Sequence, residues 1–210
     1  MLEDATTKQL RDRDWLENAI WEAGIYPAKE IPSCWWNRDG GLGICQYPTQ
    51  FAPYLIALSK LGIKRYAEIG VWVGGTFRFT VEYLKRFGLE EAFAVDIDIK
   101  DRFRQNISEI TGVQVAFIEA PSTDPEVKKA LQGFDPDLIL VDGDHTEEGA
   151  RADCKLAMSI APYVAVHDIV GEGFPGVIKV WGELKGSKQE WTDQHPDQPL
   201  SQNGMGLVKV

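Results

Sequence analysis

The sequence has few of the features that mark secreted or membrane proteins. Its three cysteines, Cys34, Cys45 and Cys154, are odd in number and form no Cys-x-x-Cys pair. This predicts free thiols in a reducing compartment. No apolar run approaches the ~18 residues of a membrane span. The charged first residues, 1–13, lack the apolar core of a signal peptide. We therefore expect a cytoplasmic protein with no membrane partner.

Basic residues are also scarce. The chain has 22 lysines and arginines against 32 acidic residues, which gives a formal charge of -10. A nucleic-acid surface or an anionic membrane would require clustered basic side chains. The composition therefore predicts a small-molecule partner and no nucleic acid.

The segment from residue 65 to residue 169 alternates between two patterns. Apolar runs predict strands at 66–70, 92–97, 113–119, 138–142 and 164–167. Amphipathic runs between them predict helices near 76–86, 100–110, 125–131 and 147–160. Strands that are apolar almost throughout indicate a parallel sheet covered on both faces. The expected fold is a doubly wound, Rossmann-like α/β sheet.

Both ends of the chain depart from this alternation. A helix at 177–184 and closing strands at 188–192 and 207–210 would complete seven strands, with a hairpin at the sheet edge. Residues 1–60 predict an N-terminal helical cap on a domain of residues 61–210. Within the cap, Trp35 and Trp36 lie beside Gly40 and Gly41, and they could form a lid over an acceptor or pack on the sheet edge. The seven tryptophans of the chain are also compatible with a homo-oligomer.

The most informative motif runs from Glu68 to Thr76, where an apolar strand ends at glycine and leads into a helix. Its pattern is Glu-x-Gly-x-x-x-Gly, with Gly70 and Gly74, and not the Gly-x-Gly-x-x-Gly that binds a pyrophosphate. Glycines let a ligand lie against bare backbone. A carboxylate at this strand end would repel a phosphate and attract an ammonium. S-adenosylmethionine (SAM) carries an ammonium and a nucleoside but no phosphate, so the motif favours SAM over NAD.

A carboxylate at the end of the second strand is the other requirement of a nucleoside site. Asp96 lies there, and we expect it to accept hydrogen bonds from both ribose hydroxyls; the alternative is a solvated loop residue. Asp98 alternates to the other face and is expected to cap the next helix. The third strand leads into Pro121 and Ser122, where adenine contacts arise in such folds. Ser122 is the candidate for that contact.

Two of the three histidines follow neighbouring central strands. Asp142 and His145 belong to an Asp-Gly-Asp-His run after the fourth strand, and His167 and Asp168 close the fifth. Ligands of open α/β sheets bind at this edge, so these four side chains are expected to converge. Asp144, in the same run, could converge with them, but we expect it to cap the following helix together with Thr146.

Carboxylates held so close together repel one another unless a cation or protons intervene. A divalent ion such as Mg²⁺ between Asp142 and Asp168 would relieve that repulsion. The imidazole of His167 better suits Mn²⁺, Fe²⁺ or Zn²⁺. The candidate metal ligands are therefore Asp142, His167 and Asp168. The alternative for His167 is a core histidine that hydrogen-bonds a neighbour.

Four motifs in this order resemble those of the class I SAM-dependent methyltransferases. They are Glu-Ile-Gly-x-x-x-Gly-Gly-Thr at 68–76, Val-Asp-Ile-Asp at 95–98, Val-Asp-Gly-Asp-His at 141–145 and His-Asp at 167–168. The sequence is most similar to the small-molecule group that contains the macrocin-type sugar O-methyltransferases and the cephalosporin-hydroxylase-like proteins. The resemblance covers residues 46–169, and its motifs are specific for the fold and the cofactor.

The resemblance implies a set of cofactor-binding residues. The strand-end glutamate and the two glycines would hold the methionine part of SAM, and the aspartate of the second strand would hold the ribose. The residues expected to bind SAM are Glu68, Gly70, Gly74, Thr76, Asp96, Ser122 and Asp142.

The resemblance also implies roles in catalysis. In metal-dependent members, the first aspartate of Asp-Gly-x-His and an acidic pair after the fifth strand bind Mg²⁺. This places Asp142 and Asp168 as ligands of Mg²⁺ or Mn²⁺, with His167 in place of one expected acid. The histidine of the motif acts as a general base in some relatives, which nominates His145. Asp142 and His145 are thus the expected catalytic residues.

These residues predict metal-assisted O-methylation of a small hydroxylated molecule, such as a sugar, a phenol or a natural product. The metal would lower the pKa of an acceptor hydroxyl, and His145 would take its proton. Three alternatives remain open. They are a nicotinamide oxidoreductase, a hydroxylase-like or non-heme metal oxygenase that uses His167 and Asp168, and a binding domain without activity.

Overall fold

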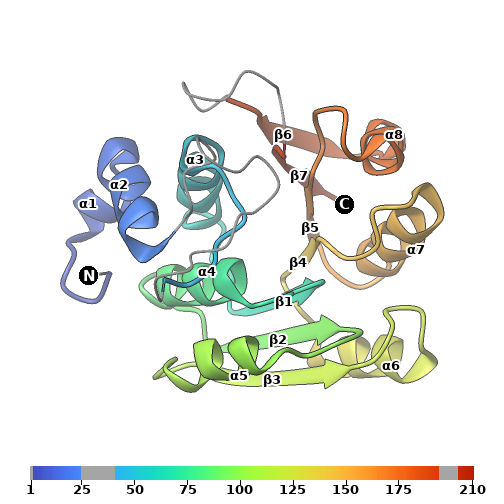
Figure 1. The fold of residues 1–210 in the computed structure, drawn as a ribbon, viewed down its shortest axis with the longest axis horizontal. Helices are drawn as coiled ribbons and strands as arrows, with labels where there is room; N and C mark the ends of the chain where they lie inside the picture. Colours follow the sequence, from blue (N-terminus) through green and yellow to red (C-terminus); the bar gives the residue numbers. More distant parts are fainter. Residues whose placement is uncertain (1, 25–40, 194–202) are drawn as a thin grey trace.

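The computed structural model describes residues 2–24, 41–193 and 203–210. In these ranges seven strands form one sheet with the order β3-β2-β1-β4-β5-β7-β6 (Figure 1). Strands β1 to β5 pair in parallel, whereas β7 is antiparallel to both β5 and β6. The predicted doubly wound fold with an edge hairpin is confirmed.

The elements lie close to their predicted positions. The strands are β1 (Arg65–Ile69), β2 (Glu91–Asp96), β3 (Gln114–Glu119), β4 (Leu138–Val141), β5 (Tyr163–His167), β6 (Ser187–Trp191) and β7 (Met205–Lys209). The helices are α1 (Thr7–Leu10), α2 (Arg13–Gly24), α3 (Pro48–Leu58), α4 (Gly75–Lys85), α5 (Asp101–Ser108), α6 (Pro125–Phe134), α7 (Glu147–Met158) and α8 (Pro175–Glu183). Strand β7 begins two residues earlier than predicted, because Met205 and Gly206 already pair with β5.

Two hydrophobic cores cover the two faces of the sheet. One lies against α1 to α5 and includes Leu140 of β4, and the other lies against α6 to α8 and includes Ile139. Successive residues of a strand point to opposite faces of the sheet. When both faces are covered, residues at successive positions must therefore be apolar. This explains why β4 is apolar throughout and why its neighbours β1 and β5 are mostly apolar.

The N-terminal helices pack in series, with α1 against α2, α2 against α3, and α3 against α4 (Figure 1). Leu10, Leu16 and Ile20 are buried in the same core as Phe77 of α4. The division into a cap of residues 1–60 and a domain of residues 61–210 remains a prediction, and the predicted lid at Trp35 and Trp36 lies outside the described residues. None of the described helices is both long and apolar enough to cross a membrane.

The register of the sheet brings the functional segments together. Ile69 at the end of β1 pairs with Val141 of β4, and Val141 pairs with Val166 of β5. The residues that follow these three strands therefore leave the sheet side by side, at its carboxyl edge.

Candidate active site

Two adjoining clefts open at the carboxyl edge of the sheet. The large cleft, about 660 Å³, lies between the loops that follow β1 to β4. The small cleft, about 240 Å³, lies over the ends of β1, β4 and β5. Gly70, Trp72, Asp142 and His145 line both clefts, so the two spaces meet at these residues.

The carboxylate of Asp96 lines the large cleft and holds the loop after β1. Its Oδ2 accepts hydrogen bonds from the backbone amides of Val71 and Trp72, both at 2.8 Å, and its Oδ1 accepts one from Asp98 at 3.0 Å. The prediction that Asp98 caps α5 is wrong. The N-cap is Lys100, which makes no side-chain capping bond, and the Asp98 carboxylate pairs with the Lys100 ammonium instead.

The two glycines of the first motif are required by contacts within the protein. At Gly70, where φ is +85°, a Cβ atom would lie 2.1 Å from the carbonyl oxygen of Asp142. At Gly74, where φ is +79°, a Cβ atom would lie 2.6 Å from the ring of Phe103. Gly70 lines both clefts, and the buried Thr76 lines the small one. Gly74 is not among the described residues that line either cleft.

Trp72 lies between these glycines in a conformation that is rare for a bulky residue. Its φ is +46°, and its side chain, 37% exposed, lines both clefts. Such outliers often mark functional sites. Trp72 was not predicted as a site residue, although an aromatic residue inside a glycine-bracketed turn was the available signal.

Glu68 lies beneath the small cleft and is 1% exposed. The hydroxyl of Tyr66 donates a hydrogen bond to its carboxyl group. Burial raises the pKa of Glu68 to about 8, although this hydrogen bond opposes the rise. Glu68 is therefore mostly protonated at neutral pH, and a cation bound beside it would favour its ionised form.

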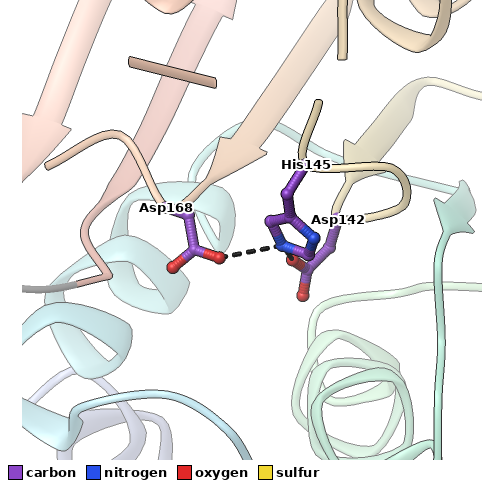
Figure 2. Close-up of side chains that lie close together, drawn as sticks. All are labelled: Asp142, His145 and Asp168. Atoms are coloured by element: carbon purple, nitrogen blue, oxygen red, sulfur yellow. Dashed lines mark ion pairs between the residues drawn. The ribbon is translucent and has the colours of Figure 1, made fainter. Parts of the chain in front are cut away.

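The four residues at the ends of β4 and β5 converge as predicted. His145 Nε2 lies 2.9 Å from Asp168 Oδ2 and 3.5 Å from Asp142 Oδ1 (Figure 2). His167 Nδ1 lies 3.0 Å from Asp142 Oδ1 and 3.4 Å from Asp168 Oδ2. We call these four side chains the Asp–His cluster.

Charges within the Asp–His cluster compensate one another. Hydrogen bonds to Asp142 and Asp168 raise the pKa of His145 to about 9. Burial alone would lower the pKa of His167, but the charges of the same two carboxylates raise it well above its usual value. Burial likewise opposes ionisation of Asp168, but the two histidines hold its pKa below the usual range. Protons on the imidazoles therefore neutralise the carboxylates when no cation is bound.

The donor atoms of the cluster fit a divalent ion. Among the described residues, the side chains of Asp142, His145 and Asp168 offer ligand atoms that all lie within 4.8 Å of one another. His167 is adjacent, and its Nε2 and the Oδ1 of Asp168 are buried without a hydrogen-bond partner. Two carboxylates with imidazole suit Mn²⁺ better than Mg²⁺, which prefers oxygen ligands.

The loop after β4 is fixed by hydrogen bonds at the start of α7. Thr146 is the N-cap and accepts from the amide of Gly149, whereas Asp144 accepts from the amide of Thr146. The predicted cap at Thr146 is confirmed, whereas the prediction that Asp144 caps the helix is wrong: Asp144 supports the turn before the helix, outside the Asp–His cluster. This arrangement positions His145 at the junction of the two clefts.

Three further cleft residues complete the site. Phe174 lies over His145, with ring centroids 4.2 Å apart, and lines the small cleft. Ile97, 71% exposed, and Ser122, which was predicted from sequence, line the large cleft. Phe174 and Ile97 were missed because an apolar residue in a loop carries no chemical signal of its own.

Comparisons with known proteins agree with this geometry. Residues 67–169 match the family model described as a methyltransferase domain. The comparison with curated proteins gave no significant match.

Solved structures of methyltransferases share the fold. The O-methyltransferase TomG from Streptomyces achromogenes, involved in tomaymycin synthesis and solved with SAM, is 11% identical, with a TM-score of 0.61 over 98% of this chain and 92% of that one. An O-methyltransferase from Bacillus cereus, solved with S-adenosylhomocysteine (SAH), is 16% identical, with a TM-score of 0.55 over 98% and 93%. CalS11, a TDP-rhamnose 3′-O-methyltransferase of calicheamicin biosynthesis, is 12% identical, with a TM-score of 0.57 over 98% and 95%.

The segment that matches the methyltransferase domain runs from β1 to the residues just after β5. It therefore contains Glu68, Asp96 and the whole Asp–His cluster. Together the matched domain, the strand order and the position of the clefts show a methyltransferase domain at residues 67–169, within a sheet of the class I methyltransferase fold.

Proposed function

We propose that this enzyme transfers the methyl group of SAM to a hydroxyl oxygen of a small molecule, such as a sugar, a phenol or another natural product. One observation carries the proposal: Asp142 and His145 line both clefts. A cofactor that extends from the large cleft toward Glu68 would reach the Asp–His cluster. The proton-accepting groups that O-methylation needs are located at that junction.

The residues of the first two strands would hold SAM. Asp96, whose oxygens accept hydrogen bonds from the β1 loop, is the candidate to accept from the ribose hydroxyls. Glu68 is the candidate for the ammonium of the methionine part, with Gly70 and Thr76 beside it, and Ser122 is the candidate for adenine. SAM supplies a methyl group that its sulfonium already activates for transfer.

His145 is the proposed general base. Its side chain is 35% exposed, against 5% for His167, so His145 is the imidazole that an acceptor can reach. It can accept a proton at Nε2 only while it is neutral, and Asp142 and Asp168 favour its charged form. Offsetting the charge of these carboxylates would return His145 toward its usual pKa.

A divalent ion would supply that offset. The proposed ligands of Mg²⁺ or Mn²⁺ are Asp142, His167 and Asp168. Such an ion would also lower the pKa of a bound acceptor hydroxyl. The buried and unpartnered Oδ1 of Asp168 supports a ligand-binding role for this carboxylate.

The charge and the cysteine content of the chain support two further parts of the proposal, which are the class of acceptor and the location in the cell. The net charge of -10 favours a small-molecule acceptor over nucleic acid. The odd number of cysteines, with no Cys-x-x-Cys pair, supports a cytoplasmic location. Cys34 lies outside the described residues.

Turnover of SAM tests the proposal. Purified enzyme is incubated with SAM and a panel of catechols, phenols and sugars, after EDTA treatment and again with Mg²⁺ or Mn²⁺ restored, and products are identified by mass spectrometry. We expect a methyl ether whose formation falls after EDTA and recovers with metal. Methylation of nitrogen or carbon would contradict the acceptor assignment, and unchanged turnover in EDTA would contradict the role of the metal.

A further inference from the structure

Asp153 is a buried carboxylate that the proposed reaction does not use. It lies on α7, is 2% exposed, and lines the large cleft. Its Oδ1 accepts a hydrogen bond from the hydroxyl of Ser122, in the loop after β3. Burying a carboxylate is costly unless its oxygens are hydrogen-bonded, so this contact explains how the charge is tolerated.

The second oxygen of Asp153 contacts the loop after β4. A Cβ atom at Gly143 would lie 2.8 Å from Asp153 Oδ2, so the absence of a side chain at Gly143 leaves room for this carboxylate. Burial raises the pKa of Asp153, and the hydrogen bonds from Ser122 and from the backbone of Asp144 oppose this rise by stabilising the charged form. Asp153 thus connects the loop that carries Ser122 with the loop that carries His145.

The contact fixes the hydrogen-bonding polarity of Ser122. A serine hydroxyl can donate one hydrogen bond and accept two. An ionised carboxylate can only accept, so the hydroxyl hydrogen of Ser122 points to Asp153. The Ser122 oxygen then offers only lone pairs to a molecule in the large cleft, which must present a donor.

We propose that Asp153 is a positioning residue that makes Ser122 an acceptor for the 6-amino group of adenine, so that the enzyme rejects cofactors with a 6-oxo purine. This inference rests on the proposed placement of SAM in the large cleft. Adenine presents an N–H donor at this position, whereas a 6-oxo purine presents an acceptor. A site built to accept from an N–H group strongly disfavours an analogue that lacks it. Exposed Ile97, in the same cleft, offers apolar contact that does not distinguish the two bases.

Calorimetric titration of the full chain with two ligands tests the inference without turnover. The ligands are SAH and its deaminated analogue S-inosylhomocysteine, which differ at the 6-position of the purine. The wild-type protein is expected to bind SAH at least about tenfold more tightly, the loss typical of an unpaired hydrogen-bonding group. In Asp153→Asn, the amide can donate to Ser122 and free its hydroxyl to donate to a 6-oxo group. The ratio of the two affinities should then fall to within about threefold.

Two more variants separate this role from a purely structural one. Glu148→Gln removes an exposed carboxylate from the same helix and should keep the wild-type ratio. Ser122→Ala removes the acceptor without adding a donor. It should weaken the binding of SAH and leave the affinity for S-inosylhomocysteine nearly unchanged. If Asp153→Asn does not fold, Ser122→Ala decides the question.

Three outcomes would overturn the inference. They are equal affinities in the wild-type protein, a wild-type ratio in folded Asp153→Asn, and a wild-type ratio in Ser122→Ala. A wild-type protein that binds neither ligand would overturn the placement of SAM itself, and the inference with it. The placement of SAM and the inference would both be supported if the wild type binds SAH more tightly than S-inosylhomocysteine and only the variants at 122 and 153 lose this preference.

Discussion

His145 Nε2 lies 2.9 Å from Asp168 Oδ2, and this contact joins the loops that follow the neighbouring strands β4 and β5. Asp168 is 3% exposed and has a φ of +61°, in the left-handed region. The contact favours the charged form of His145, which is the residue best placed to remove a proton from an acceptor. Control of that charge is therefore part of the chemistry of the site.

The pKa of His145 should depend on Asp168. In metal-free protein the carboxylates raise this pKa to about 9, so His145 is charged at neutral pH. Metal-free activity should therefore increase as the pH rises through 9, because only the neutral imidazole accepts a proton. In Asp168→Asn, the pKa should move toward its ordinary value of 6.5. Titration of the histidine ring protons by NMR in EDTA measures both values, with Glu148→Gln as the unchanged control. A wild-type His145 that titrates near 6.5 would contradict the proposed pairing.

Loss of the imidazole should affect turnover more than cofactor binding. His145→Gln is expected to lower kcat by about 10²- to 10⁴-fold, the usual contribution of a general base. The affinity for SAH should change by less than about threefold, because the proposed role of His145 is toward the acceptor. Initial rates with an acceptor from the panel, combined with calorimetry, separate the two effects. A weakened SAH affinity with unchanged kcat would assign His145 to the cofactor instead.

Cofactor binding should release a proton from Glu68. Its pKa of about 8 leaves it mostly protonated at pH 7, and an ammonium beside it would stabilise the ionised form. Affinity for SAH should therefore rise with pH from 6 toward 8, with release of up to about one proton. Calorimetry in two buffers of different ionisation enthalpy measures this number. Glu68→Gln should abolish the release, and a wild-type protein that releases no proton near pH 7 would disprove the assignment.

Gly70 and Gly62 form a matched pair for testing the junction of β1 and β4. Both have positive φ, +85° and +69°, but a Cβ atom at Gly62 would meet no atom within 4 Å. Gly62→Ala should lower the free energy of unfolding by about 1 kcal/mol, the strain of a left-handed backbone. Gly70→Ala adds a clash with the backbone oxygen of Asp142, which cannot rotate away, and should cost at least about 3 kcal/mol. Chemical denaturation measures the free energy of unfolding of both variants. Equal losses would contradict the proposed clash, because they would show that β1 and β4 can move apart enough to accommodate the Cβ atom.

Much of the fold could be predicted because its signals are local. Apolar strands, amphipathic helices and glycine-bracketed turns predicted seven strands, and the carboxyl-edge rule for parallel sheets placed Asp142 beside Asp168. The start of β7 was predicted less accurately, because Met205 pairs with β5 through contacts that are distant in sequence.

The finer structure of the site depended on tertiary contacts. Asp98 was predicted as a helix cap, but α5 begins later and Asp98 pairs with Lys100. The high pKa of Glu68 arises from burial beneath the cleft, which no motif encodes. Asp153 lies within an ordinary amphipathic helix, and only the folded structure brings it to Ser122.

A crystal structure of the enzyme with SAH tests the central assignment most directly. We predict that the ribose hydroxyls lie on Asp96, the ammonium beside Glu68, and the sulfur at the junction of the two clefts, facing His145. Density for SAH elsewhere, or a sulfur atom that points away from the Asp–His cluster, would contradict methyl transfer at this site.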